Sequence, residues 1–291
     1  MKSYLRRLQN NDVIFDEARY PTGFLELDKA LAGGFVAGLH CIGAISSLGK
    51  TTFLLQMAEN MASVGTPVIL FSLEMRPEQL VTKSVSKNMY LAALERADSQ
   101  EVDIYHHAKG YSDLMSKRNR SVFTNQEQGI YEEAIQKSSS EMLIVSETAD
   151  GKPFCIDELV KYINTYISVT KKKPVVFIDY LQFIRPDSLM TGTDKQIIDN
   201  IISSLVFTAK IQRIPIVAIS SLNRGGYDSP VTMASFKESG FIEYISPLQC
   251  DKLMMNNTKV VHEMVMIPSI IGSGEYGIRC LKNKSIPLIS L

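Results

Sequence analysis

The sequence predicts an α/β fold with a mostly parallel central sheet flanked by helices. From about residue 39 onward, short apolar segments alternate with amphipathic helical segments, which is the pattern of a parallel sheet. A Gly-Lys-Thr loop follows the first of these segments, and a later apolar segment ends at the carboxylate of Asp179. Hydrophobic residues make up 45% of the 291 residues and charged residues 21%, so the chain is not intrinsically disordered.

The first half of the pattern contains two strand–helix pairs. Residues 39–44 are predicted to form a strand that runs into a loop, and a helix over 50–63 follows it. The apolar segment 67–73 (PVILFSL) predicts a buried strand. Proline is favoured in the first turn of a helix, so Pro77 indicates a helix that begins there and continues to about residue 90.

The second half repeats the alternation. A short strand is expected over 142–145, a helix with one apolar face over 157–169, and a β-rich strand over 174–179. A long helix over 194–213 has apolar residues at helical spacing, and it leads into another buried strand over 214–220. Weaker strand candidates lie near 252–256, 261–267 and 277–282.

Three segments interrupt the alternation. Residues 91–140 are polar and charged with helix-like pieces, which predicts an insertion on the surface. Residues 184–194 and 223–240 are rich in Gly, Ser, Pro, Asn and charged residues, which is typical of loops. No segment has the composition of an interdomain linker, so a single domain is expected.

Charge and residue spacing exclude several classes of protein. The 31 Lys and Arg residues balance 31 Asp and Glu residues, so the chain is not a strongly basic nucleic-acid-binding domain, although a local basic groove remains compatible. The four cysteines show no C-x-x-C spacing, and the adjacent pair His106–His107 fits a solvated loop better than a metal site. No apolar run approaches the roughly 18 residues of a membrane span, and the N-terminus has no apolar stretch of a secretory signal.

The loop after the first strand has the context of a phosphate-binding P-loop. It lies between a strand and a helix, where free backbone N–H groups and the helix dipole bind an anion. Gly49 permits close backbone approach, Lys50 can reach the β- and γ-phosphates, and the Thr51 hydroxyl can ligate Mg²⁺. The alternative interpretation is an ordinary helix N-cap followed by a lysine that has no binding role. The candidate nucleotide-binding residues are Ala44, Ser46, Ser47, Leu48, Gly49, Lys50, Thr51 and Thr52.

Three further polar positions follow buried strands and are therefore expected at the same edge of the sheet. Asp179 is the candidate that holds Mg²⁺, through water or from just outside the groups that bind the metal directly. Glu74 follows the strand over 67–73 and is the candidate general base that polarises the attacking water. Ser221, in the segment SSLNR, is a candidate sensor of the γ-phosphate. For each position a simpler interpretation exists: a strand end, a surface glutamate and a loop cap.

Taken together, these segments resemble the RecA-fold ATPase domain of DnaB-type replicative helicases from about residue 20 to 250. Ala44 in the first glycine position of the Walker A loop is usual in that family. The matching motifs are PTGFLELD at 21–28, SLEM at 72–75, IDYLQ at 178–182 and FKESG at 236–240. The resemblance implies a RecA-like P-loop NTPase core with C-terminal antiparallel strands over 20–291, ATP and Mg²⁺ as cofactors, and ATP hydrolysis.

The chain departs from the family pattern at three places. Ser221 stands where family members have a γ-phosphate-sensing glutamine. Lys282 and Lys284 match a Lys-x-Arg pair that reaches the neighbouring subunit's ATP site, and lysine lacks the planar fork of arginine. Residues 1–19 correspond to a stub or linker helix where family members carry an N-terminal helical domain.

The resemblance also implies partners and an activity. It predicts an ATP-dependent helicase or translocase in the cytoplasm that moves on single-stranded DNA during replication, works as a homo-oligomeric and hexameric ring, and meets a primase or helicase loader. The expected DNA contacts are Arg185, Lys195, Arg224 and Lys237. The alternative is a RecA-like DNA-dependent ATPase without unwinding activity, such as a loader, a recombination-related protein or a regulatory switch.

Overall fold

The computed structural model describes residues 18–44, 49–96, 109–116, 123–138, 142–187, 191–221, 252–257 and 260–268. Its centre is one seven-stranded sheet with the strand order β3-β2-β4-β5-β1-β7-β6. The first five strands in this order are parallel, and β7 and β6 are antiparallel additions at one edge. The strands are β1 (Gly38–Ala44), β2 (Val68–Ser72), β3 (Met142–Val145), β4 (Val175–Asp179), β5 (Pro215–Ser221), β6 (Lys252–Asn257) and β7 (Val260–Pro268).

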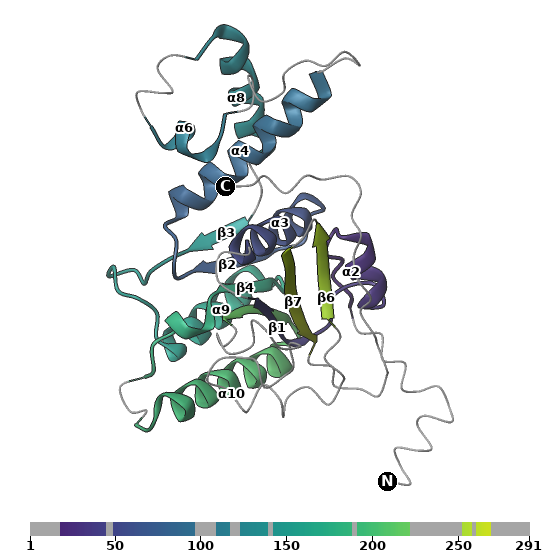
Figure 1. Ribbon diagram of the computed structural model, residues 1–291. Helices are drawn as coiled ribbons and strands as arrows, with labels where there is room; N and C mark the ends of the chain where they lie inside the picture. Colours follow the sequence, from purple (N-terminus) through teal and green to yellow (C-terminus); the bar gives the residue numbers. More distant parts are fainter. Residues whose placement is uncertain are drawn as a thin grey trace.

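Helices cover both faces of the sheet (Figure 1). On one face, α2 (Leu25–Ala30) and α3 (Lys50–Ser63) pack against the side chains of a core that includes Ile42, Leu70 and Phe177. On the other face lie α9 (Ile156–Thr170) and α10 (Asp194–Gln212), over a second core. Every residue of β2 and β4 is buried, as expected for central strands of a parallel sheet with helices on both faces.

The entry segment is fixed against α3 by polar contacts. The Asp28 carboxylate accepts hydrogen bonds from the backbone N–H groups of Thr22 (2.6 Å) and Gly23 (3.2 Å). Asn60 of α3 donates to the Thr22 carbonyl at 3.2 Å. Gly34 has φ +120°, and a Cβ there would meet the carbonyl oxygen of Tyr20 at 2.2 Å, so only glycine fits this turn.

A helical cluster stands apart from the sheet. The long helix α4 (Pro77–Arg96) leaves the sheet and meets α6 (Tyr111–Met115) and α8 (Asn125–Ser138) (Figure 1). These three helices share a small apolar core of their own, formed by Val85, Met89, Ala92, Leu114, Ile130 and Ala134. The cluster joins the main body through α4, where Lys87 forms an ion pair with Glu59 of α3.

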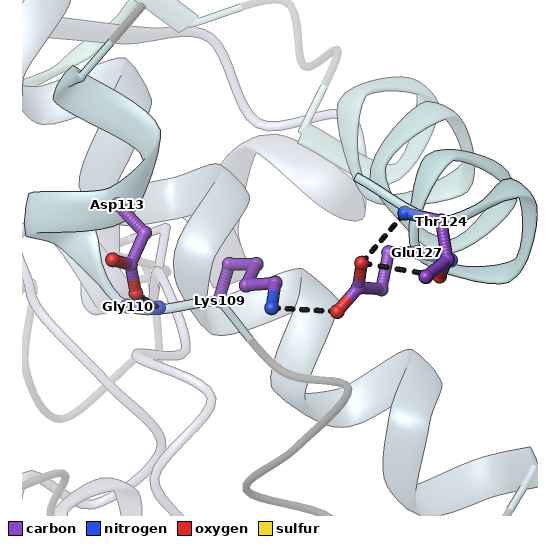
Figure 2. Close-up of polar contacts among 5 residues, drawn as sticks. All are labelled: Lys109, Gly110, Asp113, Thr124 and Glu127. Atoms are coloured by element: carbon purple, nitrogen blue, oxygen red, sulfur yellow. Dashed lines mark hydrogen bonds and ion pairs between the residues drawn. The ribbon is translucent and has the colours of Figure 1, made fainter. Parts of the chain in front are cut away.

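A buried carboxylate anchors the polar side of this cluster (Figure 2). Glu127 accepts a hydrogen bond from the backbone N–H of Thr124 at 2.7 Å and from its hydroxyl at 3.1 Å. Its N–H in turn donates to the Thr124 hydroxyl at 3.2 Å, which completes a capping box at the start of α8. Its other oxygen pairs with the ammonium of Lys109 at 2.6 Å. The segment before α6 is thereby tied to α8.

The predicted α/β fold with a mostly parallel sheet is confirmed, and most strand bounds differ from the expected ones by one or two residues. The helix that begins at Pro77 is longer than expected, because the apolar cluster stabilises it as far as Arg96. Two of the three weak C-terminal candidates are strands β6 and β7, and the third, near 277–282, lies outside the described residues. Among the described helices, none is long and apolar enough to cross a membrane.

Candidate nucleotide-binding site

Strand register brings the predicted site residues to one edge of the sheet. Ser72, the last residue of β2, is paired with Asp179, the last residue of β4. On the other side, Ala44 of β1 is paired with Ser221 of β5. The four strands β2, β4, β5 and β1 are consecutive neighbours, so their carboxyl ends lie side by side. Ligands bind at this edge of open α/β sheets.

The first turn of α3 begins at this edge. Gly49 has φ +83° and caps the helix, and the carbonyl oxygen of Gly49 accepts the N–H of Phe53 at 2.9 Å. A Cβ at Gly49 would meet no atom within 4 Å, so glycine is needed here for the left-handed backbone rather than for space. Lys50 and Thr51 follow in the first turn of the helix and are half-buried, whereas Thr52 is exposed.

Asp179 is the most unusual side chain of the site. It is 1% exposed, and neither carboxylate oxygen accepts a hydrogen bond from any residue that the structure describes. Burial raises the pKa of this carboxyl to about 6. The nearby Thr51 hydroxyl lowers this pKa in part, although its geometry to the carboxylate is not that of a normal hydrogen bond. The charge of Glu74 raises this pKa further, and the charges of Lys50 and Lys83 oppose the rise.

Lys50 faces both acidic groups of the site. Burial lowers the pKa of its ammonium group, and the negative charges of Asp179 and Glu74 act against that decrease. These mutual influences place Lys50, Asp179 and Glu74 in one electrostatic cluster. The structure therefore brings together the three groups that the sequence assigned to phosphate binding, metal binding and proton transfer.

The turn after β2 holds Glu74 in place. The hydroxyl of Ser72 donates to the carbonyl of Met75 at 2.6 Å and closes the turn. The N–H of Leu73 donates to the carbonyl of Asp179 at 2.8 Å, which ties this turn to the end of β4. Between these fixed points, the side chain of Glu74 is exposed to solvent, where a water molecule can reach it.

Two residues near the site were not among the predicted site residues, although Tyr180 belongs to the IDYLQ motif. Tyr180 follows Asp179, and burial, together with the charges of Glu74 and Asp179, raises the pKa of its hydroxyl. Lys83 lies about two turns into α4, where its ammonium group influences Asp179 and lies 5.8 Å from the ring centroid of Tyr111 in α6. A lysine in an otherwise ordinary helix is recognised as part of the site only when the fold places it there.

Two of the predicted DNA-contacting residues are described. Arg185 is exposed, and its backbone pairs with the segment before α9, where its N–H donates to Phe154 at 3.0 Å and its carbonyl accepts from Ile156 at 3.1 Å. Lys195 is exposed in the first turn of α10, which begins with a capping box between Thr193 and Gln196. Arg185 lies on the connection between β4 and α10, and Lys195 lies at the start of α10.

Other predicted site residues lie outside the described residues, so their roles stay predictions. Several belong to the phosphate-binding loop, two to the expected DNA-contacting segment and two to the C-terminal tail. They are Ser46, Ser47, Leu48, Arg224, Lys237, Lys282 and Lys284.

The described groups form a suitable site for a nucleotide and its metal. The unpaired carboxylate of Asp179 and the hydroxyl of Thr51 are oxygen ligands of the kind that Mg²⁺ takes. Lys50 supplies a positive charge for phosphate oxygens. Because Asp179 is buried and no described residue donates to it, the site has an acceptor that a ligand, water or an ion can satisfy.

Comparisons with known proteins show the family to which the chain belongs. A family model described as the DnaB-like helicase C-terminal domain matches residues 20–255, a range that includes the segment 91–140. The replicative DNA helicase DnaB of Haemophilus influenzae is 29% identical over 230 residues, which are 76% of this chain and 43% of that protein. The replicative DNA helicase DnaC of Bacillus subtilis is 28% identical over 230 residues. The chain thus spans less than half the length of these relatives.

Solved structures show the same fold. One of them, described as an ATPase domain, superposes with a TM-score of 0.67 at 20% identity, covering 88% of this chain and 82% of that one. A DnaB-like replicative helicase, solved in a study of its interactions with primase, superposes with a TM-score of 0.65 at 20% identity, covering 91% of this chain and 61% of that one. At this identity the likeness concerns the fold, which is that of a RecA-like ATPase domain.

Proposed function

The chain belongs to the DnaB-like helicase C-terminal domain family, and on this premise we propose that it is a motor that couples ATP hydrolysis to movement along single-stranded DNA in replication. The observation that carries the proposal is the buried, unpaired carboxylate of Asp179 beside Lys50 and Thr51. A buried carboxylate without a partner destabilises the fold, so its presence at the carboxyl edge of the sheet supports a binding role.

We assign the groups around the nucleotide as follows. Lys50 binds the phosphates, Thr51 ligates Mg²⁺, and Asp179 holds it directly or through water. The metal, when bound, neutralises charge on the phosphate oxygens. Glu74, exposed beside this group, accepts a proton from the attacking water. Ser221 at the end of β5 is the position from which the γ-phosphate is sensed.

The remaining assignments concern the DNA and the assembly. Arg185, Lys195, Arg224 and Lys237 contact the phosphates of single-stranded DNA. The working form is a homo-oligomer, a hexameric ring in the cytoplasm, in which Lys282 and Lys284 complete the ATP site of the next subunit. A primase or helicase loader is the proposed protein partner.

The test is ATP hydrolysis measured with and without a single-stranded oligonucleotide. We expect hydrolysis that requires Mg²⁺ and increases with the oligonucleotide, and a Lys50→Ala variant that has lost it because the phosphates lose their cation. Lys161→Ala is a matched control, since Lys161 is exposed on α9 away from the sheet edge. A rate that no single strand stimulates, or that survives Lys50→Ala, contradicts the proposal.

The second candidate is a DNA-dependent ATPase that does not unwind duplexes, such as a loader, a recombination-related protein or a regulatory switch. Ser221 and Lys284 favour keeping it, because they stand where family members have a glutamine and an arginine. Strand displacement on a forked duplex separates the two candidates. Displacement that depends on ATP supports the motor, and DNA-stimulated hydrolysis without displacement supports the second candidate.

A further inference from the structure

A side-chain hydrogen bond joins the ends of β4 and β5 beyond the point where their backbone pairing ends. The register between these strands runs from Val176↔Ile216 to Ile178↔Ala218. Gln182 lies in the short 3-10 helix η1 (Leu181–Phe183) that follows β4, and its amide nitrogen Nε2 donates to the hydroxyl of Ser220 at 3.0 Å. Ser220 is 1% exposed, so the contact is shielded from water on that side.

This contact lies on the face of the sheet opposite the nucleotide. Ile178, Ile216 and Ala218 belong to the core under α9 and α10, and side chains alternate along a strand. Ser220, two residues after Ala218, therefore points to that same face, away from α3. Neither Gln182 nor Ser220 is among the groups around Lys50 and Asp179 that bind the nucleotide.

Each end of the contact leads into a segment that the proposed function assigns to DNA. Gln182 is followed within three residues by Arg185, and Ser220 precedes the segment that contains Arg224. At the same time Gln182 follows Asp179 by three residues, and Ser220 is paired in register with Gly43, the residue before Ala44 of the phosphate-binding loop. The bond thus connects the two DNA segments at the place where both begin, next to the ATP site.

The contact leaves one polar atom of Gln182 without a hydrogen-bond partner among the described residues. The carbonyl oxygen Oε1 of Gln182 is fully buried and accepts no hydrogen bond from any residue in the described part of the chain. An unpaired buried acceptor is unfavourable, so an arrangement that gives Oε1 a donor is stabilised relative to this one.

We propose that Gln182 is a positioning residue which, through Ser220, holds the Arg185 segment after β4 in register with the end of β5 beside the ATP site, so that DNA binding accelerates ATP hydrolysis. The proposal rests on the proposed function, because it explains the stimulation by DNA rather than the hydrolysis itself. Loss of one buried hydrogen bond of this kind corresponds to an effect of about 3- to 10-fold.

The variants are Gln182→Met, which keeps the length of the side chain without its polar atoms, Ser220→Ala, and the double variant. Gln212→Met is the matched control, because Gln212 also donates through Nε2, here to Asn164 at 2.8 Å, and joins α10 to α9 far from the sheet edge. Ser220→Thr keeps a hydroxyl at the β5 end. The readouts are the basal hydrolysis rate, the maximal rate with a single-stranded oligonucleotide, and the thermal midpoint of each variant.

We expect Gln182→Met and Ser220→Ala to lower the ratio of stimulated to basal rate by about 3- to 10-fold, with basal rates unchanged. The double variant should lose no more than either single variant, because both remove one contact. Gln212→Met and Ser220→Thr should keep the ratio of the parent.

Two outcomes contradict the proposal: one leaves the proposed function standing, and the other contradicts that function as well. If the parent is stimulated by DNA and both single variants are stimulated equally, or if their losses add in the double variant, the coupling role of Gln182 is wrong and the proposed function stands. If the parent itself shows no stimulation by any single strand, the proposed function fails and this proposal fails with it.

Discussion

Two buried carboxylates, Asp179 at the end of β4 and Glu127 in α8, have opposite surroundings. Glu127 is 6% exposed and bound by Lys109 and Thr124, and although burial raises its pKa, these hydrogen bonds and the charge of Lys109 outweigh burial and leave the pKa lowered. Asp179 is 1% exposed and has no hydrogen-bond partner among the described residues, and burial raises its pKa to about 6. The same functional group thus stabilises one region and destabilises the other.

This difference separates structural polar groups from binding groups. In the helical cluster, Glu127 caps α8 and ties it to the segment before α6, and each of its oxygens has a partner. At the sheet edge, the oxygens of Asp179 have no hydrogen-bond partner among the described residues, at a cost in stability, and the proposed function assigns them to the nucleotide-bound metal. Substitutions in the two regions should therefore differ in which property they change.

The largest expected effect concerns the rate. Glu74→Gln should lower ATP hydrolysis by about 10²- to 10⁴-fold while leaving ATP binding in place, because the amide cannot accept the proton of the attacking water. Glu78→Gln is a matched control, since Glu78 is exposed in the first turn of α4. Single-turnover hydrolysis together with titration of a fluorescent ATP analogue measures both quantities. Hydrolysis at the parent rate would show that another group is the base.

The next effect concerns stability in the helical cluster. Glu127→Ala should lower the free energy of unfolding by about 1 to 3 kcal/mol, because it removes a cap and leaves Lys109 without its partner. Glu132→Ala, an exposed position on the same helix, should change it by less than about 0.5 kcal/mol. Chemical denaturation measures both. The hydrolysis rate per folded molecule should stay at the parent level in each variant. A rate that falls together with stability would show that the helical cluster also affects the ATP site.

The third expected effect is a difference in pH dependence between the two carboxylates. The folded pKa of Asp179, about 6, lies above its ordinary value of 3.8, so the folded protein binds an extra proton between these values and gains stability as the pH falls through them. Glu127 has a lowered folded pKa, so its contribution is present above its ordinary value of 4.5 and is lost as the pH falls through the folded value.

Thermal midpoints from pH 7 down to pH 4 test this contrast. The advantage of Asp179→Asn over the parent should be complete above pH 6 and should shrink toward pH 4. The thermal midpoint of Glu127→Gln should lie below that of the parent by a constant amount from pH 7 down to about pH 4.5. Curves that fall in parallel for both variants would show that the two carboxylates do not differ as described.

The sequence predicted the parts of the fold that follow from local pattern. The apolar segment that ends at Asp179 and the Gly-Lys-Thr loop were sufficient to predict that Asp179 and the first turn of α3 lie at the same edge of the sheet, because parallel strands bring their carboxyl ends together. The unpaired state of Asp179 could not be predicted, since it depends on which side chains of other strands reach it.

The helical cluster shows the same limit. Residues 91–140 are polar overall, and their few apolar residues become a core only when Leu114 and Ile130 meet Val85 and Met89 of α4. The spacing of Thr124 and Glu127 is a capping-box signal that the sequence does contain. The partner Lys109, by contrast, is identified only by the fold, and so are Lys83 near Asp179 and the contact between Gln182 and Ser220.

The most direct test of the account is the thermal midpoint of Asp179→Asn with and without Mg²⁺ and a non-hydrolysable ATP analogue. Without ligand, the variant should be more stable than the parent by up to about 3 kcal/mol, which is the free-energy equivalent of the raised pKa. With ligand at about 100 times its Kd, the parent should gain about 2.7 kcal/mol and the variant clearly less. A variant that is less stable than the parent without ligand, or that gains as much from Mg²⁺ and the analogue, would contradict the claim that this carboxylate is reserved for the nucleotide-bound metal.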